Sequence, residues 1–245
     1  MKFQFGVEIE AYSETMDHRN LAELLEVERG VKRDSSSHDS LDWGIYFDRS
    51  IKHKSKDVYP IELVSPVMQG ASALEEIRSL LNQAKDLANL RINSTCSIHI
   101  HVGVESMYKV LIGNEKPTID DQIAQIVEPF FKVFSEHYED ELLAMMPPSR
   151  RESRYCNSIK SVSFNVDMSK YYTLAYRPRI NTLEFRLHSG TLSFTKIANW
   201  IAIIELVCEN FLEDMHADKP SIFNLLYGPL LSYYNGRVKK FQTTM

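Results

Sequence analysis

The chain has 245 residues, 44% of them hydrophobic and 25% charged, with a formal net charge of −5. This acidic balance argues against a general nucleic-acid-binding surface, which usually carries an excess of Lys and Arg. No apolar run reaches the roughly 18 residues of a membrane span. The three cysteines are far apart and odd in number, which argues against a disulfide framework and a thiolate zinc site. We therefore expect a single cytoplasmic domain over residues 1–245.

Residues 3–12 alternate apolar side chains with Gly and Glu, which predicts a strand with one apolar face. The opposite face carries Glu8 and Glu10, about 7 Å apart along the backbone. Two neighbouring carboxylates repel each other unless a cation lies between or beside them. A solvent-facing edge strand is the alternative interpretation.

Residues 20–28 have the spacing of a short helix, and residues 33–40 form a polar, Ser-rich loop. The segment 41–51 holds Asp48 and Ser50 between apolar residues. Residues 59–66 predict another strand, in which Glu62 stands inside an apolar, β-branched run. Burying such an acid is costly unless it is paired or binds a metal.

A helix is predicted over residues 72–90, opened by a capping box of Ser72 and Glu75. Residues 96–102 then predict a strand whose apolar face is opposed by His99 and His101. A single strand histidine is usually structural or solvated, whereas two on one face favour a functional role as much as a structural one.

Residues 118–146 predict a long helix or a pair of helices, opened by Thr118 and Asp121 and interrupted by Pro129. A basic loop follows at residues 147–155, where Arg150 and Arg154 suggest a contact with an anion. A solvated loop explains the same residues equally well.

The stretch 182–192 alternates Leu and Phe with Glu184, Arg186 and His188, so we expect these three polar side chains on one face of a strand. A carboxylate beside a guanidinium suits a cation next to a phosphate. A solvated face with a cross-strand ion pair is the simpler alternative. Residues 193–215 predict a helix, and one or two short helices with a basic end follow residue 220.

Strands of one sheet share their faces, so the acids and histidines of these four strands are expected to come together. Stacked without compensation, the carboxylates would cost several kcal/mol through repulsion and desolvation. Divalent cations with oxygen ligands and one imidazole would remove that cost. The pattern therefore points to nucleotide chemistry through Mg²⁺.

In their order along the chain, these motifs resemble the amidoligase family, whose members are carboxylate–amine ligases with the catalytic fold of glutamine synthetase and γ-glutamylcysteine synthetase. The resemblance extends from residue 3 to about residue 208. One departure is Ser97, because glycine is usual two residues before the first histidine. The matching segments are Phe5-Gly6-Val7-Glu8-Ile9-Glu10, Asp48-Arg49-Ser50, Glu62-Leu63-Val64-Ser65-Pro66, Ile98-His99-Ile100-His101-Val102 and Leu183-Glu184-Phe185-Arg186…Gly190-Thr191.

The resemblance implies an α+β fold, in which an antiparallel sheet lines a cleft and helices pack on its back. It also implies ATP bound with Mg²⁺ or Mn²⁺, and the formation of an amide through an acyl phosphate, with release of ADP and phosphate. The implied substrates are a small-molecule or peptide carboxylate and an amine. Their identity stays open, and the protein is expected to be a monomer or a homodimer without a membrane partner.

The resemblance also implies roles for individual residues. Glu8 and Glu184 are expected both to bind metal and to take part in catalysis, and Arg186 is expected to bind ATP and stabilise the transferring phosphoryl group. The expected metal ligands are Glu8, Glu10, Glu62, Glu184 and His101, the last preferred over His99, which would meet a phosphate. Arg150 and Arg154 would hold ATP phosphates or, for Arg150, the substrate carboxylate, and Asp48 or Ser50 would contact the amine or a metal.

Two other functions compete with this one. A metal-dependent hydrolase could use the same Glu and His residues to activate water, although Arg186 beside a metal acid suits phosphoryl transfer better. A binding protein that keeps the fold without the chemistry is the third possibility. The filled acidic positions give it little support.

Overall fold

The computed structural model describes residues 1–31, 42–55, 57–113, 116–160, 162–166, 171–217 and 221–242. The polar loop predicted at 33–40 lies outside these ranges. The described residues form a mixed α and β fold built on one seven-stranded sheet with the order β2-β3-β4-β1-β5-β7-β6. The strands are β1 Phe5–Ser13, β2 Glu28–Val31, β3 Gly44–Phe47, β4 Tyr59–Val64, β5 Ser97–Gly103, β6 Leu174–Arg177 and β7 Thr182–Ser189.

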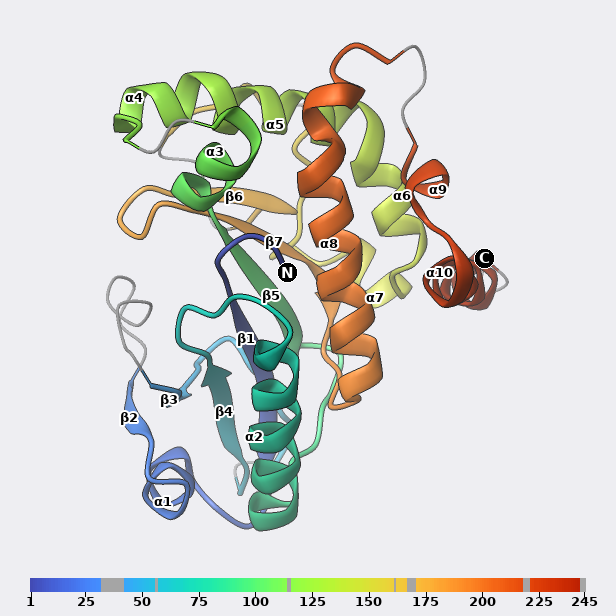
Figure 1. Cartoon of the computed structure of the whole chain (residues 1–245). Coiled ribbons are helices and arrows are strands. Elements are labelled where there is room, and N and C mark those ends of the chain that lie inside the picture. Colours follow the sequence, from blue (N-terminus) through green and yellow to red (C-terminus); the bar gives the residue numbers. More distant parts are fainter. Residues whose placement is uncertain are drawn as a thin grey trace.

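Five of the six strand pairings are antiparallel, as predicted, and the β2–β3 pair at one edge is parallel. The helical segments flank this sheet, and α2 and α8 lie across one of its faces (Figure 1). Their bounds are α1 His18–Leu24, α2 Ser72–Ala88, α3 Val104–Ile112, α4 Ile119–Gln122, η1 Ile123–Val127, α5 Glu128–Val133, η2 Phe134–Tyr138, α6 Glu139–Ala144, α7 Pro148–Arg151, α8 Phe194–Asp214, α9 Ile222–Leu225 and α10 Gly228–Gln242.

The hydrophobic core lies between the sheet and these helices. The odd-numbered residues of β1 and the even-numbered residues of β5 face it, because Val7 pairs with Ile100 and Ile9 pairs with Ile98. From β7, Phe185 packs edge-on against Phe130 at a ring-centroid distance of 5.7 Å. The alternation read from the sequence therefore identified the face of the sheet that the helices cover. The prediction of a single domain over the whole chain stays a prediction.

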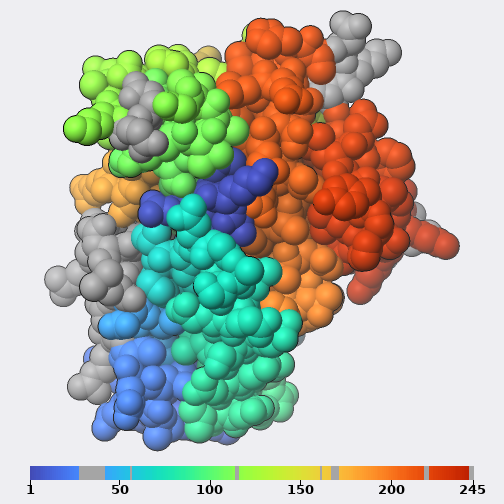
Figure 2. Space-filling model, in the orientation of Figure 1, coloured from blue at the N-terminus to red at the C-terminus, as the bar shows by residue number. Residues whose placement is uncertain are grey.

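The N-terminal residues lie between two helices that are distant in sequence. The backbone nitrogen of Lys2 donates to Glu205 on α8, and that of Gln4 donates to the Ser106 hydroxyl on α3 at 2.8 Å. Figure 2 shows these residues, in blue, between the helices of the upper and lower halves of this side of the molecule. The first strand is thereby tied to the helical layer at its start.

Helix boundaries differ from the prediction at two places. The prediction of a capping box at Ser72 is wrong. That motif requires Ser72 to be the N-cap, but Ser72 is already the first helical residue, and the N-cap Ala71 makes no side-chain hydrogen bond. At residues 119–144 the chain stays helical past Pro129, and the five-residue π-helical turn η1 immediately precedes α5, in whose first turn the proline lies. Proline has no backbone N–H, so this position donates no hydrogen bond to the preceding turn, which here is the π-helical turn η1. The capping box of Thr118 and Asp121 is confirmed.

The strand pairing of β7 is interrupted by a bulge, and this corrects the prediction for His188. Ile100 pairs with Phe185 and Ile98 pairs with His188, so one residue of β5 opposes two residues of β7. After the bulge the alternation is reversed. His188 therefore lies on the helix-covered face, with its ring 5.2 Å from the ring of Trp200 in α8.

Close to the bulge, Gly190 passes directly over Cys96. Its backbone nitrogen donates to the carbonyl of Cys96 at 2.7 Å. A Cβ atom at position 190 would lie 2.6 Å from the Cβ of Cys96 and 2.9 Å from its carbonyl carbon. Only glycine fits this contact between the start of β5 and the end of β7 without moving the backbone.

The buried imidazole of His188 is expected to make the protein acid-sensitive. Burial, with a smaller contribution from Arg237, lowers its pKa from near 6.5 to about 3. The unfolded chain binds a proton below pH 6.5 and the folded chain does not, so stability falls as the pH falls. The loss is roughly 1.4 kcal/mol per pH unit. Thermal unfolding at pH 6.5 and pH 4.5 should show a smaller shift for His188→Asn, which keeps a donor for the Ser189 carbonyl. Equal shifts in both proteins would contradict this.

Candidate active site

The strand register brings the predicted site residues together on one face of the sheet. Across β1 and β5 Glu8 pairs with His99, across β1 and β4 Glu10 pairs with Glu62, and across β5 and β7 His101 pairs with Glu184. Side chains directly opposite on neighbouring strands share a face. We call this set the polar face, which consists of Glu8, Glu10, Glu62, His99, His101, Glu184 and Arg186.

The side chains of the polar face are as inaccessible as the hydrophobic core. Their exposed fractions range from 1% for Glu62 to 9% for Arg186. Ionised groups at this depth lose most of their hydration and need compensation by opposite charge or hydrogen bonds. The cleft predicted over this face stays a prediction.

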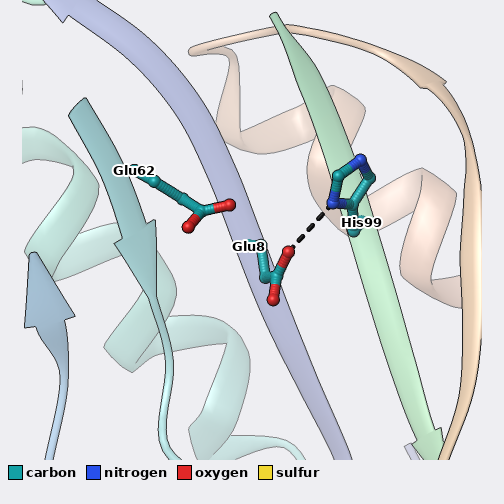
Figure 3. Close-up of side chains that lie close together, drawn as sticks. All are labelled: Glu8, Glu62 and His99. Atoms are coloured by element: carbon teal, nitrogen blue, oxygen red, sulfur yellow. Dashed lines mark hydrogen bonds and ion pairs between the residues drawn. The ribbon is translucent and has the colours of Figure 1, made fainter. Parts of the chain in front are cut away.

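Carboxylate and imidazole atoms of the polar face converge in three groups that could each hold a metal ion. Within each group the ligand atoms lie within 4.8 Å of one another. Figure 3 shows the first group, in which Glu62 and His99 point toward Glu8 from the two neighbouring strands. Glu8 and Glu62 each belong to two groups, so the three possible sites form one continuous series. The groups are Glu8, Glu62 and His99; Glu8, His101 and Glu184; and Glu10, Asp48 and Glu62.

His99 is held on both sides of its ring. Its Nδ1 atom lies 2.9 Å from Oε2 of Glu8 and 3.6 Å from Oε1 of Glu184, while its Nε2 atom lies 2.8 Å from the Ser97 hydroxyl. Burial, with the positive charge of Arg186, lowers the pKa of His99 to about 4. The imidazole is therefore neutral at pH 7, the form in which histidine binds metals.

His101 has the same arrangement with the ring reversed. Its Nδ1 atom lies 3.0 Å from the Thr182 hydroxyl, and its Nε2 atom lies 3.3 Å from Oε1 of Glu8 and 3.8 Å from Oε1 of Glu184. A metal-binding histidine usually donates its second ring N–H to an oxygen atom, and the Thr182 hydroxyl can be that acceptor. Either histidine of this face has the geometry for that role, and the preference for His101 stays a prediction.

Glu184 joins the metal groups to two arginines, Arg186 and Arg177. Its Oε1 atom accepts a hydrogen bond from Nη1 of Arg186, and its Oε2 atom lies 3.6 Å from Nε of Arg177 on β6. Burial alone would raise the pKa of Glu184, but Arg186 and the two histidines lower it. Within the described part of the chain, the buried Nε of Arg186 has no hydrogen-bond partner. That donor is available for an anion.

Arg150 lies under the polar face and binds the backbone rather than a carboxylate. Its guanidinium donates to the carbonyls of Arg186 and Leu187, and Cys156 approaches the Arg186 carbonyl at 3.8 Å. Arg150 therefore supports the β7 bulge from the short helix α7, in a segment predicted to be a loop. Arg154 is exposed, and its guanidinium binds the hydroxyl of Tyr155 at 2.8 Å.

Asp48 follows β3 and extends the polar face at its acidic end. Both of its oxygens accept hydrogen bonds from Ser50, one from the backbone nitrogen at 2.7 Å and one from the hydroxyl at 2.8 Å. Burial, and then the charge of Asp48, raises the pKa of Glu10 to about 7. Three carboxylates, Glu10, Asp48 and Glu62, therefore lie close together at this end of the site.

With this geometry established, comparisons with known proteins identify the family. The chain matches the family described as "Putative amidoligase enzyme" over residues 1–207. The protein belongs to the amidoligase family. This is the family that the motifs resemble. No curated protein matches this amidoligase.

A solved structure is also similar to this amidoligase, a bifunctional glutathione synthetase from Pasteurella multocida. The sequence identity is 14% and the TM-score is 0.43, over 98% of this chain and 47% of that protein. The amidoligase spans about half the length of that protein. A likeness this distant carries no conclusion about the reaction. None of the helices in the described part of the chain combines the length and apolar character needed to span a bilayer.

Three residues of the amidoligase site escaped the sequence interpretation. Thr182 precedes Glu184 by two residues, so the period of the strand could have placed it on the polar face. Ser97 was identified only as a departure from the family pattern. Arg177 reaches Glu184 through the pairing of β6 with β7, which no spacing in the sequence reveals.

Proposed function

We propose that this amidoligase is an ATP-dependent ligase that forms an amide bond through an acyl-phosphate intermediate. One observation carries the proposal: Glu184 belongs to a possible metal group and also binds Arg186. A cation site directly beside a guanidinium is what a transferring phosphoryl group requires, because its charge is spread over several oxygens. The family supports the ligase class, and this pairing supports the use of a nucleotide.

The donor atoms of the polar face fit hard divalent cations such as Mg²⁺ or Mn²⁺. Carboxylate oxygens dominate all three groups, and imidazole takes part in two. Burial, and then the charge of Asp48, raises the pKa of Glu10, and a bound cation would favour its ionised form. Glu8, Glu10, Glu62, Glu184 and one histidine would hold the cations, which when bound would neutralise the charge of the nucleotide phosphates.

The guanidinium of Arg186 would act on the phosphoryl group in transit. Its Nη1 is fixed by Glu184, and its Nε has no partner in the described residues and could donate to a phosphoryl oxygen. In the first step a substrate carboxylate oxygen would bond to the γ-phosphorus as its bond to ADP breaks. In the second step an amine nitrogen would bond to the acyl carbon, expelling phosphate and losing a proton.

Further parts of the proposal rest on the family resemblance. They are a glutamine-synthetase-like catalytic fold, a cleft over the polar face, small-molecule or peptide substrates, and a cytoplasmic location. Asp48, held by Ser50, would attract the amine or a cation. Arg154 would enter the site only by leaving Tyr155.

A metal-dependent hydrolase is the second candidate function. The imidazoles in two of the three groups favour it, because mixed His and carboxylate sites also bind zinc and activate water. Hydrolysis with Zn²⁺ and no ATP would support this candidate. Dependence on Mg·ATP would exclude it as the main activity.

Titration of ATP by calorimetry, with and without Mg²⁺, tests the proposed function. We expect wild-type protein to bind ATP only with Mg²⁺, and Glu184→Gln to lose at least about 10-fold in affinity through the lost metal ligand. Glu75→Gln, an exposed position on α2, is the matched control and should bind as the wild type does.

A screen of carboxylate and amine pairs for ADP release then tests turnover. Glu184→Gln should fold normally and release no ADP with any pair that the wild type uses. ADP release by this variant at the wild-type rate would refute the proposal. Binding of Mg·ATP without turnover over a broad screen would favour a binding protein.

A further inference from the structure

Ser97 contacts two residues of the polar face at once. It is the first residue of β5 and only 2% exposed. Its hydroxyl lies 2.8 Å from Nε2 of His99, and its backbone nitrogen donates to Oε2 of Glu10 at 2.8 Å. A glycine, usual in the family at this position, could make the second contact but not the first.

The chemistry of a metal-binding imidazole explains why a hydroxyl at Nε2 matters. The nitrogen that binds a metal must be unprotonated, so the other nitrogen of a neutral ring carries the proton and needs an acceptor. In His99 the nitrogen nearer to carboxylates is Nδ1, at 2.9 Å from Glu8 and 3.6 Å from Glu184, whereas Nε2 lies 3.8 Å from Oε1 of Glu10. For Nδ1 to bind a cation, the proton must reside on Nε2, where the Ser97 oxygen can accept it.

We propose that Ser97 is a positioning residue for His99, which favours the Nε2–H tautomer and aims Nδ1 at a cation shared with Glu8. The backbone nitrogen of Ser97 also binds Glu10, which belongs to the metal group formed with Asp48 and Glu62. This inference rests on the metal site of the proposed function. It assigns His99 to metal binding, whereas the sequence had suggested a phosphate contact.

Thr182 provides an internal comparison. It holds His101 by Nδ1, so that ring presents Nε2 to Oε1 of Glu8, while Ser97 holds His99 by Nε2 and leaves Nδ1 beside Oε2 of Glu8. The two hydroxyls thus orient two imidazoles toward the two oxygens of one carboxylate. Loss of either hydroxyl should disturb only the histidine that it holds.

The test measures metal binding directly, with Mn²⁺ followed by electron paramagnetic resonance. Ser97→Ala and Ser97→Gly both keep the backbone nitrogen that holds Glu10 and lose only the hydroxyl. We expect each to bind Mn²⁺ about 10- to 100-fold more weakly than wild type. Ser97→Thr keeps a hydroxyl and should restore most of the affinity. Thermal unfolding without metal confirms that each variant is folded.

A second measurement uses ¹¹³Cd²⁺ and ¹⁵N-labelled protein. Wild type should show a cadmium–nitrogen coupling at Nδ1 of His99, and the two hydroxyl-free variants should lose or weaken it while any coupling at His101 persists. Wild-type Mn²⁺ affinity in both hydroxyl-free variants, or coupling of cadmium to Nε2 of His99, would overturn the role of Ser97. If the wild type binds neither ion, the metal site of the proposed function fails with it.

Discussion

Replacing Glu8 by glutamine is expected to reduce the affinity for Mn²⁺ by more than about 100-fold and to abolish ADP release. This loss exceeds the one expected when a residue that only hydrogen-bonds to a metal ligand is replaced. Glu8 belongs to two of the three metal groups, and its two oxygens face His99 and His101. The amide keeps the size of the side chain and loses its charge. Mn²⁺ titration and an ADP-release assay measure the two effects.

The fold should survive the same change. Glu8→Gln removes one of several neighbouring buried carboxylates, and its remaining oxygen can still accept a hydrogen bond from His99. We therefore expect the metal-free variant to unfold at a temperature no lower than that of the wild type. Tight Mn²⁺ binding by Glu8→Gln would contradict the central place given to this residue.

Replacing Arg186 by lysine is expected to lower kcat by roughly 10³-fold, the lower range for an arginine that stabilises phosphoryl transfer. Lysine keeps the positive charge beside Glu184, but it lacks the rigid planar fork that would hold Glu184 and a phosphoryl oxygen in fixed positions. ATP affinity measured by calorimetry should fall much less than turnover, since the guanidinium acts on charge that develops during transfer.

Arg78→Lys is the matched control for this comparison. Arg78 is half-exposed on α2, pairs with Glu75 and stacks over the ring of Phe194. Its replacement should leave turnover unchanged. Equal turnover of Arg186→Lys and wild type would show that the guanidinium has no part in the chemistry.

The polar face was predictable from the sequence because strand periodicity is simple. Glu8, Glu62, His101 and Glu184 each stand among apolar neighbours, so the alternation fixes their face whatever the order of the strands. Helices were predicted in the same way from apolar spacing, as α8 shows. Local rules suffice where burial on one side dominates.

Features that depend on pairing between strands were not predictable. The bulge opposite His99 reverses the alternation of β7 and moves His188 to the helix-covered face, and nothing in the local pattern announces it. Arg177 reaches Glu184 only because β6 pairs with β7 in one particular register. Arg150 looked like an anion-binding residue because sequence shows its charge, but its partners are backbone carbonyls.

The contact of Gly190 with Cys96 limits how this enzyme can diverge. These two backbones cannot move apart without shifting the start of β5, which carries His99, and the end of β7, which carries Arg186. Even one added methyl group at position 190 would therefore change the spacing between these two strands. Substitutions that change the choice of substrate are therefore expected in segments other than the contact between Gly190 and Cys96. A relative with any other residue at this position is expected to have rebuilt its chemistry or lost it.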